Sequence, residues 1–254
     1  LVVRGRPEDM GLRPDGDPLF EEPGVTRSPD QETHAQVPGG ADDPVTGAGT
    51  IDFTVREAFR TATLWIMLAA MTMRFAAQPS VIVHLAPLLT DRGMTPVQAG
   101  GTVGLLSLVS IPSRVAAGWL GDRFPKRYVM LWLMALDVLA LFVLLIATEV
   151  WHLYVFVMLF GSGYGAGILN WAMLGEYYGR ARFATLRGAM GLFYTWGGVL
   201  GPVFAGWIFD TTQSYTVALQ FFMLDYLLSG IGYAFCIPPK PPERYRPHQI
   251  IPNP

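Results

Sequence analysis

Six long apolar segments, separated by short polar turns, dominate the chain after its first quarter. They cover residues 62–89, 96–120, 128–147, 151–175, 186–209 and 216–237. Each is long enough to cross about 30 Å of hydrocarbon, which takes about 20 helical residues. Because an open strand edge cannot satisfy its backbone polar groups in lipid, we expect each segment to be a helix. The pattern predicts an all-α membrane protein with a six-helix transmembrane bundle over residues 62–237.

The flanks of this region are polar. Residues 1–50 have no apolar period and are rich in Pro, Gly and Asp, a composition typical of a disordered loop. Thr54 and Glu57 have the spacing of a capping box, which predicts a short amphipathic juxtamembrane helix within residues 51–61. Residues 238–254 form a polar tail. The bundle is therefore expected between two soluble extensions.

Composition supports a membrane protein over a soluble enzyme. The chain is 51% hydrophobic and 15% charged, whereas soluble domains carry about a quarter charged residues. The single cysteine, Cys236, excludes an intrachain disulfide and a cysteine-based metal cluster. No arrangement typical of nucleophilic catalysis is present. We therefore expect no enzyme activity, no metal, no cofactor and no nucleic-acid partner, with the lipid bilayer as the surrounding medium.

The positive charges predict the orientation. Of the 18 Lys and Arg residues, fifteen fall in segments that six crossings place on one side. The positive-inside rule makes that side cytoplasmic, so residues 1–50 and both termini are expected in the cytoplasm. We expect the membrane to be a bacterial cell membrane. The start, Leu1-Val2-Val3 followed by Arg4, is typical of the last turn of a helix. We expect the chain to be a fragment.

A charged turn carries the main family resemblance. The run Gly118-Trp-Leu-Gly-Asp122-Arg123-Phe-Pro-Lys126-Arg127 resembles the G-x-x-x-D-R-x-G-R-R signature of the major facilitator superfamily. Further similar stretches lie at residues 6–12, 84–93, 176–179 and 198–210. In that family the signature recurs between helices 8 and 9. The resemblance implies that the six segments are helices 7 to 12, that residues 1–50 are the central loop, and that an N-terminal six-helix half is missing.

The spacing R-x-x-x-G-x-x-x-D around Arg114 resembles the monocarboxylate and oxalate/formate branch of that superfamily. The resemblance implies that Arg114, in helix 8, binds the carboxylate of the substrate. Two positions depart from the branch. Ser110 replaces an acidic residue found in many animal carriers, and residues 188–209 lack the lysine of the oxalate carriers.

Arg114 and Asp137 are charged residues expected at matching depth, about 13 and 15 Å into the membrane. An ionisable group in mid-membrane marks a pathway or is paired. Arg114 can face a central cavity and bind an anion, since a guanidinium makes two parallel bonds to a carboxylate. Alternatively, Arg114 and Asp137 form a structural pair between helices 8 and 9.

Five further residues are candidates for the substrate site. Arg74 is expected halfway along helix 7, where it contacts substrate or bonds to helix-end carbonyls. His84 is a second substrate contact or a hydrogen-bonded core residue. Asn170 follows Gly161-Ser-Gly-Tyr-Gly-Ala-Gly167, whose small residues let membrane helices approach closely. Tyr194 and Trp196 supply an aromatic wall or only pack against other helices.

Proton coupling and gating involve other residues. Candidates for proton coupling are Asp137, Asp225 and His84, although Asp225 can also stay protonated without any transport role. We expect a cytoplasmic gate formed by Gly118, Asp122, Arg123, Lys126 and Arg127 together with Glu176 and Arg180.

These features predict a secondary transporter half that moves a small organic anion, a monocarboxylate, by alternating access. One alternative is an amphiphile or drug efflux carrier of the same superfamily. The other is a six-helix membrane sensor or assembly partner that transports nothing.

Overall fold

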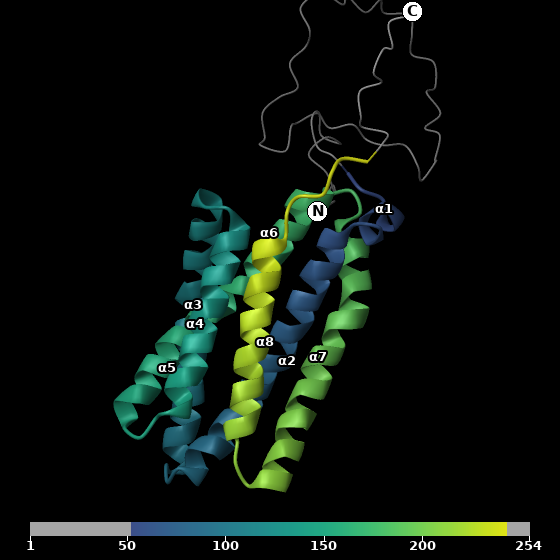
Figure 1. The fold of residues 1–254 in the computed structure, drawn as a ribbon. Helices are drawn as coiled ribbons and strands as arrows, with labels where there is room; N and C mark the ends of the chain where they lie inside the picture. The colour runs from purple at the N-terminus through teal and green to yellow at the C-terminus, as the bar shows by residue number, and fades with distance from the viewer. Residues whose placement is uncertain (1–51, 243–254) are drawn as a thin grey trace, which may run out of the picture. The chain divides into compact units, whose positions relative to one another are not determined.

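The structure is a computed structural model that describes residues 52–242; the predicted loop over residues 1–50 and the end of the C-terminal tail lie outside this range. Six helical segments are long and apolar enough to cross a membrane, which confirms the predicted all-α bundle (Figure 1). They are α2 (Ala62–Asp91), α3 (Pro96–Arg123), α4 (Lys126–Leu145), the combined α5 (Val150–Ser162) and α6 (Ala166–Tyr178), α7 (Phe183–Thr212) and α8 (Thr216–Phe235). The short helix α1 (Val55–Phe59) precedes them.

The fourth spanning segment is interrupted. The sequence predicts one helix over residues 151–175, whereas the structure places the 3₁₀ turn η2 (Gly163–Gly165) between α5 and α6. Three glycines surround Tyr164 at this point, at positions 161, 163 and 165. Their missing side chains let neighbouring helices approach the backbone closely. The turn is therefore a local departure from α-helical geometry in the middle of the span.

Local sequence signals set several helix ends. Thr54 and Glu57 form the predicted capping box of α1, with the Glu57 carboxylate accepting from the Thr54 N–H at 2.8 Å. Thr95 and Gln98 form an equivalent box at the start of α3, and Pro96 is the first residue of that helix. Gly179, with a φ of 82°, ends α6 in a conformation that disfavours a side chain. These caps keep the connections between spanning helices short.

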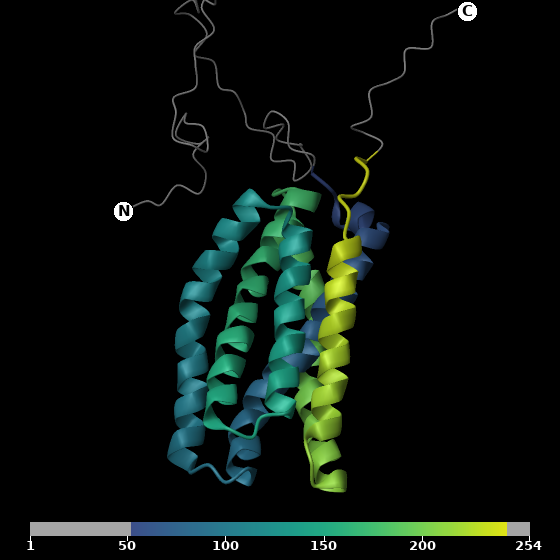
Figure 2. The same ribbon diagram turned by 60° about the vertical axis from the view of Figure 1, so that its left-hand side comes forward.

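The helices are antiparallel neighbours, and their loops alternate between two ends. We call the end that carries α1 the α1 end. The α3–α4 and α6–α7 connections and the end of α8 lie there, while the other three connections lie at the opposite end (Figure 2). In the same view α5 lies between α3 and α4, and it packs against both. On the other side of the bundle, α2 packs along α7 and α8, and α8 packs against α4.

Two helices leave much of their apolar surface uncovered. Of the most apolar stretch of α3 and α7, 17% and 22% are buried, against 44% or 50% in the other spanning segments. α2 and α6 each contact both of these helices. Exposed side chains on them include Val115 (73%) and Leu192 (73%). Exposed apolar side chains thus line faces of α3 and α7 that the described helices leave uncovered.

Candidate functional site

Arg114 lies on the exposed face of α3, in the middle of the helix. Its neighbours Ile111 and Val115 are 61% and 73% exposed, and Arg114 is itself exposed. Its guanidinium carbon lies 5.9 Å from the centre of the Tyr164 ring in η2. Within residues 52–242 no carboxylate forms an ion pair with it, so the alternative pair between Arg114 and Asp137 is not formed. The guanidinium is therefore open to a negatively charged group that arrives from outside the bundle.

Arg74 has the opposite environment. It lies in α2 with 4% of its surface exposed, and its Nη2 donates to the Gln78 side chain at 2.8 Å. Its Nε is buried and has no hydrogen-bond partner in the described part of the chain. Asp137 of α4 is likewise buried, with 2% of its surface exposed. Both ionisable residues are thus withdrawn from water, and within residues 52–242 they form no ion pair with each other.

Asp137 also touches the turn η2. A Cβ placed on Gly163 would overlap both carboxylate oxygens of Asp137, so only glycine leaves space there. On the other side of the turn, the Ser113 hydroxyl of α3 donates to the Gly161 carbonyl at 2.9 Å. The turn is thus held between α3 and α4, and it carries Tyr164 towards Arg114. Sequence reasoning missed Tyr164 and Gly163, although the glycine repeat around them was the available signal.

Asn170 lies in the interior of the bundle and is 1% exposed. Its side-chain NH₂ donates to the Met71 sulfur at 3.1 Å, and its carbonyl accepts from the Tyr233 hydroxyl at 2.9 Å. These bonds connect α6 to α2 and α8. In this arrangement Asn170 does not reach the exposed face that carries Arg114.

Asp225 lies on α8 and is 8% exposed. The neighbouring Tyr226 is fully buried, and its hydroxyl has no hydrogen-bond partner among the described residues. We call Arg74, Asp137, Tyr164 and Tyr226, which come from four different elements, the interior cluster.

His84 lies far from the interior cluster, near the end of α2 that is opposite α1. Its Nε2 lies 3.0 Å from the Pro202 carbonyl oxygen of α7, and its Nδ1 lies 3.2 Å from the Tyr215 hydroxyl. A carbonyl can only accept, so Nε2 carries a proton and donates to it, while either Nδ1 or the Tyr215 hydroxyl can donate in the second bond. Burial, followed by Asp91 and Asp210, raises the pKa of Tyr215. His84 therefore ties α2 to α7 and to the α7–α8 connection.

The two aromatic candidates in α7 lie in different surroundings. Tyr194 is partly buried, with its ring centre 4.6 Å from Phe75 of α2 and 5.9 Å from Trp171 of α6. Trp196 is 62% exposed and makes no contact with this group of rings. Arg187 lies over the Trp171 ring at 4.6 Å. The structure thus adds Phe75, Trp171 and Arg187 to the residues around the uncovered faces of α3 and α7.

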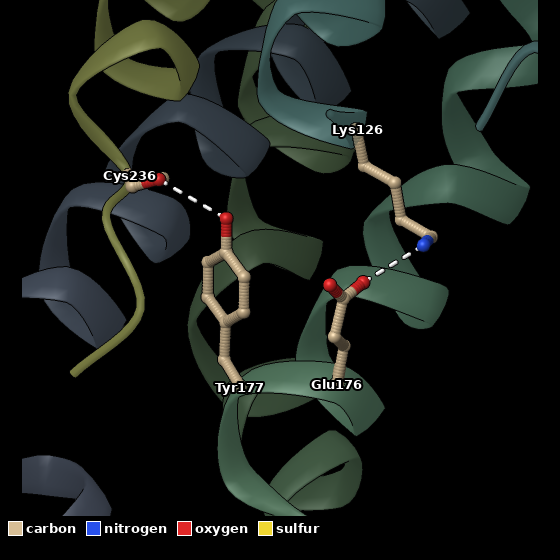
Figure 3. Close-up of polar contacts among 4 residues, drawn as sticks. All are labelled: Lys126, Glu176, Tyr177 and Cys236. Carbon is tan, nitrogen blue, oxygen red and sulfur yellow. Dashed lines mark hydrogen bonds and ion pairs between the residues drawn. The ribbon is translucent and has the colours of Figure 1, made fainter. Parts of the chain in front are cut away.

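An ion pair connects two elements of the predicted gate at the α1 end. The Lys126 ammonium lies 2.8 Å from a carboxylate oxygen of Glu176, which joins the start of α4 to the end of α6 (Figure 3). Beside it the Tyr177 hydroxyl donates to the Cys236 carbonyl at 3.1 Å and so connects α6 to the end of α8 (Figure 3). Burial raises the pKa of the Cys236 thiol to about 12, so the thiol stays protonated near neutral pH.

The remaining gate candidates do not converge on one point. Arg123 lies over the Trp119 ring at 3.9 Å, and Arg127 donates to the Tyr128 hydroxyl at 3.1 Å. Asp122 is exposed, and a Cβ on Gly118 would meet nothing within 4 Å. The backbone N–H of Arg180 donates to the Asp52 carboxylate at 2.8 Å, which attaches the segment before α1 to the α6–α7 connection.

Six helical segments long and apolar enough to cross a membrane define the class of the chain as a polytopic membrane protein. The sequence model of the Major Facilitator Superfamily matches residues 19–202 and 63–252. The chain therefore belongs to the Major Facilitator Superfamily, whose members are membrane transporters.

The chain is similar to several curated proteins named monocarboxylate transporters. Monocarboxylate transporter 13 of Rattus norvegicus is 30% identical over 165 residues, which cover 61% of this chain and 37% of the relative. The Bos taurus protein of the same name is 29% identical over 205 residues, covering 78% of this chain and 46% of the relative. Monocarboxylate transporter 12 of Xenopus laevis is 30% identical over 159 residues, covering 61% and 33%. The chain spans less than half the length of these relatives.

Proposed function

We propose that the chain is one half of a secondary active transporter that moves a small organic anion, a monocarboxylate, by alternating access. The observation that carries this proposal is the exposed Arg114 guanidinium within the spanning helix α3, which lacks a carboxylate partner among the described residues. A charge in such a place is costly unless it has a role. The relatives named monocarboxylate transporters support the same substrate class.

The chemistry of Arg114 suits a carboxylate. A guanidinium presents planar donors that form two parallel hydrogen bonds with a carboxylate, and it stays charged at every physiological pH. Tyr164 adds an aromatic surface beside it. We assign Arg114 the role of main anchor. Arg74 and His84 are secondary contacts only if α2 rearranges during transport, because both are engaged in other contacts here.

Alternating access needs a second bundle that rocks against this one. The uncovered faces of α3 and α7 are the surfaces that we assign to it, with the substrate site at the midplane between α2, α3, α6 and α7. The positive-inside rule supports a cytoplasmic α1 end, where the ion pair between Lys126 and Glu176 would close or stabilise the gate. Proton coupling through Asp137, Asp225 or His84 is part of the same proposal, and the bacterial membrane remains a prediction.

The second candidate function is efflux of an amphiphile or drug by a carrier of the same fold. The rings of Phe75, Tyr194 and Trp171, which pack together beside α7, favour it because aromatic side chains offer a large apolar contact area. An efflux carrier of this kind would use Arg114 little, so the two candidates differ in their dependence on this residue.

Uptake by the full-length protein in proteoliposomes tests the choice. We expect Arg114→Ala to lower the uptake of labelled acetate, propionate or pyruvate at least tenfold, and Arg114→Lys to restore part of it. Arg60→Ala, at an exposed arginine next to α1, is the matched control and should transport normally. Carboxylate uptake that is unchanged in Arg114→Ala would remove the anion proposal and favour the amphiphile carrier.

A further inference from the structure

The residue that accompanies Arg114 stands on an unusual piece of backbone. Tyr164 is the central residue of the three-residue 3₁₀ turn between α5 and α6. A 3₁₀ turn has poorer hydrogen bonds than an α-helix, and a short stretch of it inside a helix often marks a hinge or strain. The position of the Tyr164 ring beside Arg114 therefore depends on what surrounds the turn.

The surroundings of the turn are closely packed at specific atoms. A Cβ on Gly163 would overlap the Asp137 carboxylate, and one on Gly165 would overlap the Ala117 methyl group of α3. A Cβ on Gly167, four residues after Gly163 in the same segment, would meet nothing within 4 Å. The carboxylate of Asp137 is therefore one wall of the space that the turn occupies.

The Asp137 carboxylate is buried together with the turn. Asp137 is 2% exposed, and Gly163, against which it lies, is also buried. Within residues 52–242 no Lys or Arg forms an ion pair with it, so packing against the turn is the contact that the structure shows.

Two polar atoms of the cluster are left without hydrogen bonds inside the described range. They are the Nε of Arg74 and the hydroxyl of Tyr226, both buried. Buried polar atoms of this kind are rare in folded proteins and call for an explanation. If these residues served only stability, we would expect both atoms to form hydrogen bonds within the bundle.

We propose that Asp137 is a positioning residue for the anion site, which holds the turn η2 so that Tyr164 packs against the Arg114 guanidinium. This inference rests on the proposed function. The Asp137 carboxylate limits the backbone position at Gly163, and the turn presents Tyr164 to Arg114. Asp137 itself is buried, whereas Arg114 is exposed.

The expected effect is a change in apparent affinity more than in maximal rate. When the turn shifts, Arg114 loses the ring beside it, and a cation–π contact of this kind corresponds to about a three- to fivefold change. We expect Gly163→Ala to raise KM for the transported carboxylate by that factor, with Vmax per folded carrier nearly unchanged. Gly167→Ala is the matched control, because its added methyl group meets open space, and it should keep the wild-type KM.

A second set of variants identifies the cause of the shift. In a background with the carboxylate removed, Asp137→Ser, the added methyl group has room, so Gly163→Ala should raise KM no further. Tyr164→Leu should give the same rise in KM alone, while Tyr154→Leu, at an exposed ring of α5 (57%), should not. These variants serve equally if Gly163→Ala alone does not fold.

The proposed function and this inference fail in different ways. Unchanged uptake in Arg114→Ala removes the anion site and the inference together. Reduced uptake in Arg114→Ala, with a wild-type KM in Gly163→Ala or in Tyr164→Leu, overturns only the positioning role. Equal effects of Gly163→Ala and Gly167→Ala, or additive effects of Gly163→Ala and Asp137→Ser, also overturn it.

Discussion

Two arginines within neighbouring membrane-spanning helices have opposite surroundings. Arg74 in α2 is 4% exposed and donates a hydrogen bond to Gln78. Arg114 in α3 is exposed and has the ring of Tyr164 beside it. Neither arginine forms an ion pair within residues 52–242. The comparison therefore separates a guanidinium buried inside the bundle from one on an exposed helix face. The type of residue is the same, so the difference comes from which face of each helix carries it.

The largest effect on stability should come from the buried Asp137. Asp137→Ala removes the carboxylate that fills the space at Gly163, which we expect to destabilise the protein by about 1–3 kcal/mol because a cavity remains. Chemical unfolding of the purified full-length protein measures the loss. Arg114→Ala, measured beside it, should change the stability by less than about 1 kcal/mol because the side chain is exposed. Equal losses in both variants would contradict the distinction between the buried and the exposed residue.

The effect of His84 on stability should be smaller, because its contribution comes from hydrogen bonds between helices. His84→Ala removes two hydrogen bonds that connect α2 to α7 and to Tyr215. Hydrogen bonds between membrane helices contribute about 0.6 kcal/mol each, so we expect a loss near 1 kcal/mol. Tyr215→Phe removes one of the two bonds and should cost about half as much in the same unfolding measurement. A larger loss in Tyr215→Phe than in His84→Ala would show that the histidine is not the centre of the connection.

The smallest effect should come from the ion pair at the α1 end. The side chains of Lys126 and Glu176 are 22% and 54% exposed, so water and salt screen them and the pair contributes about 0.2–1 kcal/mol. A double-mutant cycle with Lys126→Ala and Glu176→Gln, repeated at high salt, measures the coupling. A coupling energy well above 1 kcal/mol that persists at high salt would contradict this expectation, because it would show that the pair is shielded from water.

The six spans were predictable from sequence because hydropathy and length are local properties. Each predicted segment corresponds to a helix or helix pair, and the predicted capping residue Thr54 marks a real helix start. The rotation of each helix about its axis is not local, since it depends on packing against helices far away in the sequence. This is why Asp137 was considered as a partner for Arg114 at matching depth, while the structure places its carboxylate against Gly163 of η2.

The interruption in the fourth span could be predicted only in part. The glycines around Tyr164 signal close packing, and this expectation follows from their missing side chains alone. The identity of the group that fills the space at Gly163 depends on α4, which lies beside the turn only in the folded bundle. The same reason explains why Asn170, placed by sequence at the cavity, lies among Met71 and Tyr233 in the interior.

Equilibrium binding of a carboxylate to the purified full-length protein tests the role of Arg114 most directly. Titration calorimetry with the monocarboxylate that the wild type transports should give a measurable affinity for wild type and for Gly167→Ala. Arg114→Ala should bind it at least tenfold more weakly while unfolding at the wild-type temperature. Wild-type affinity in Arg114→Ala would contradict the account, because the exposed guanidinium would then have no anion to receive.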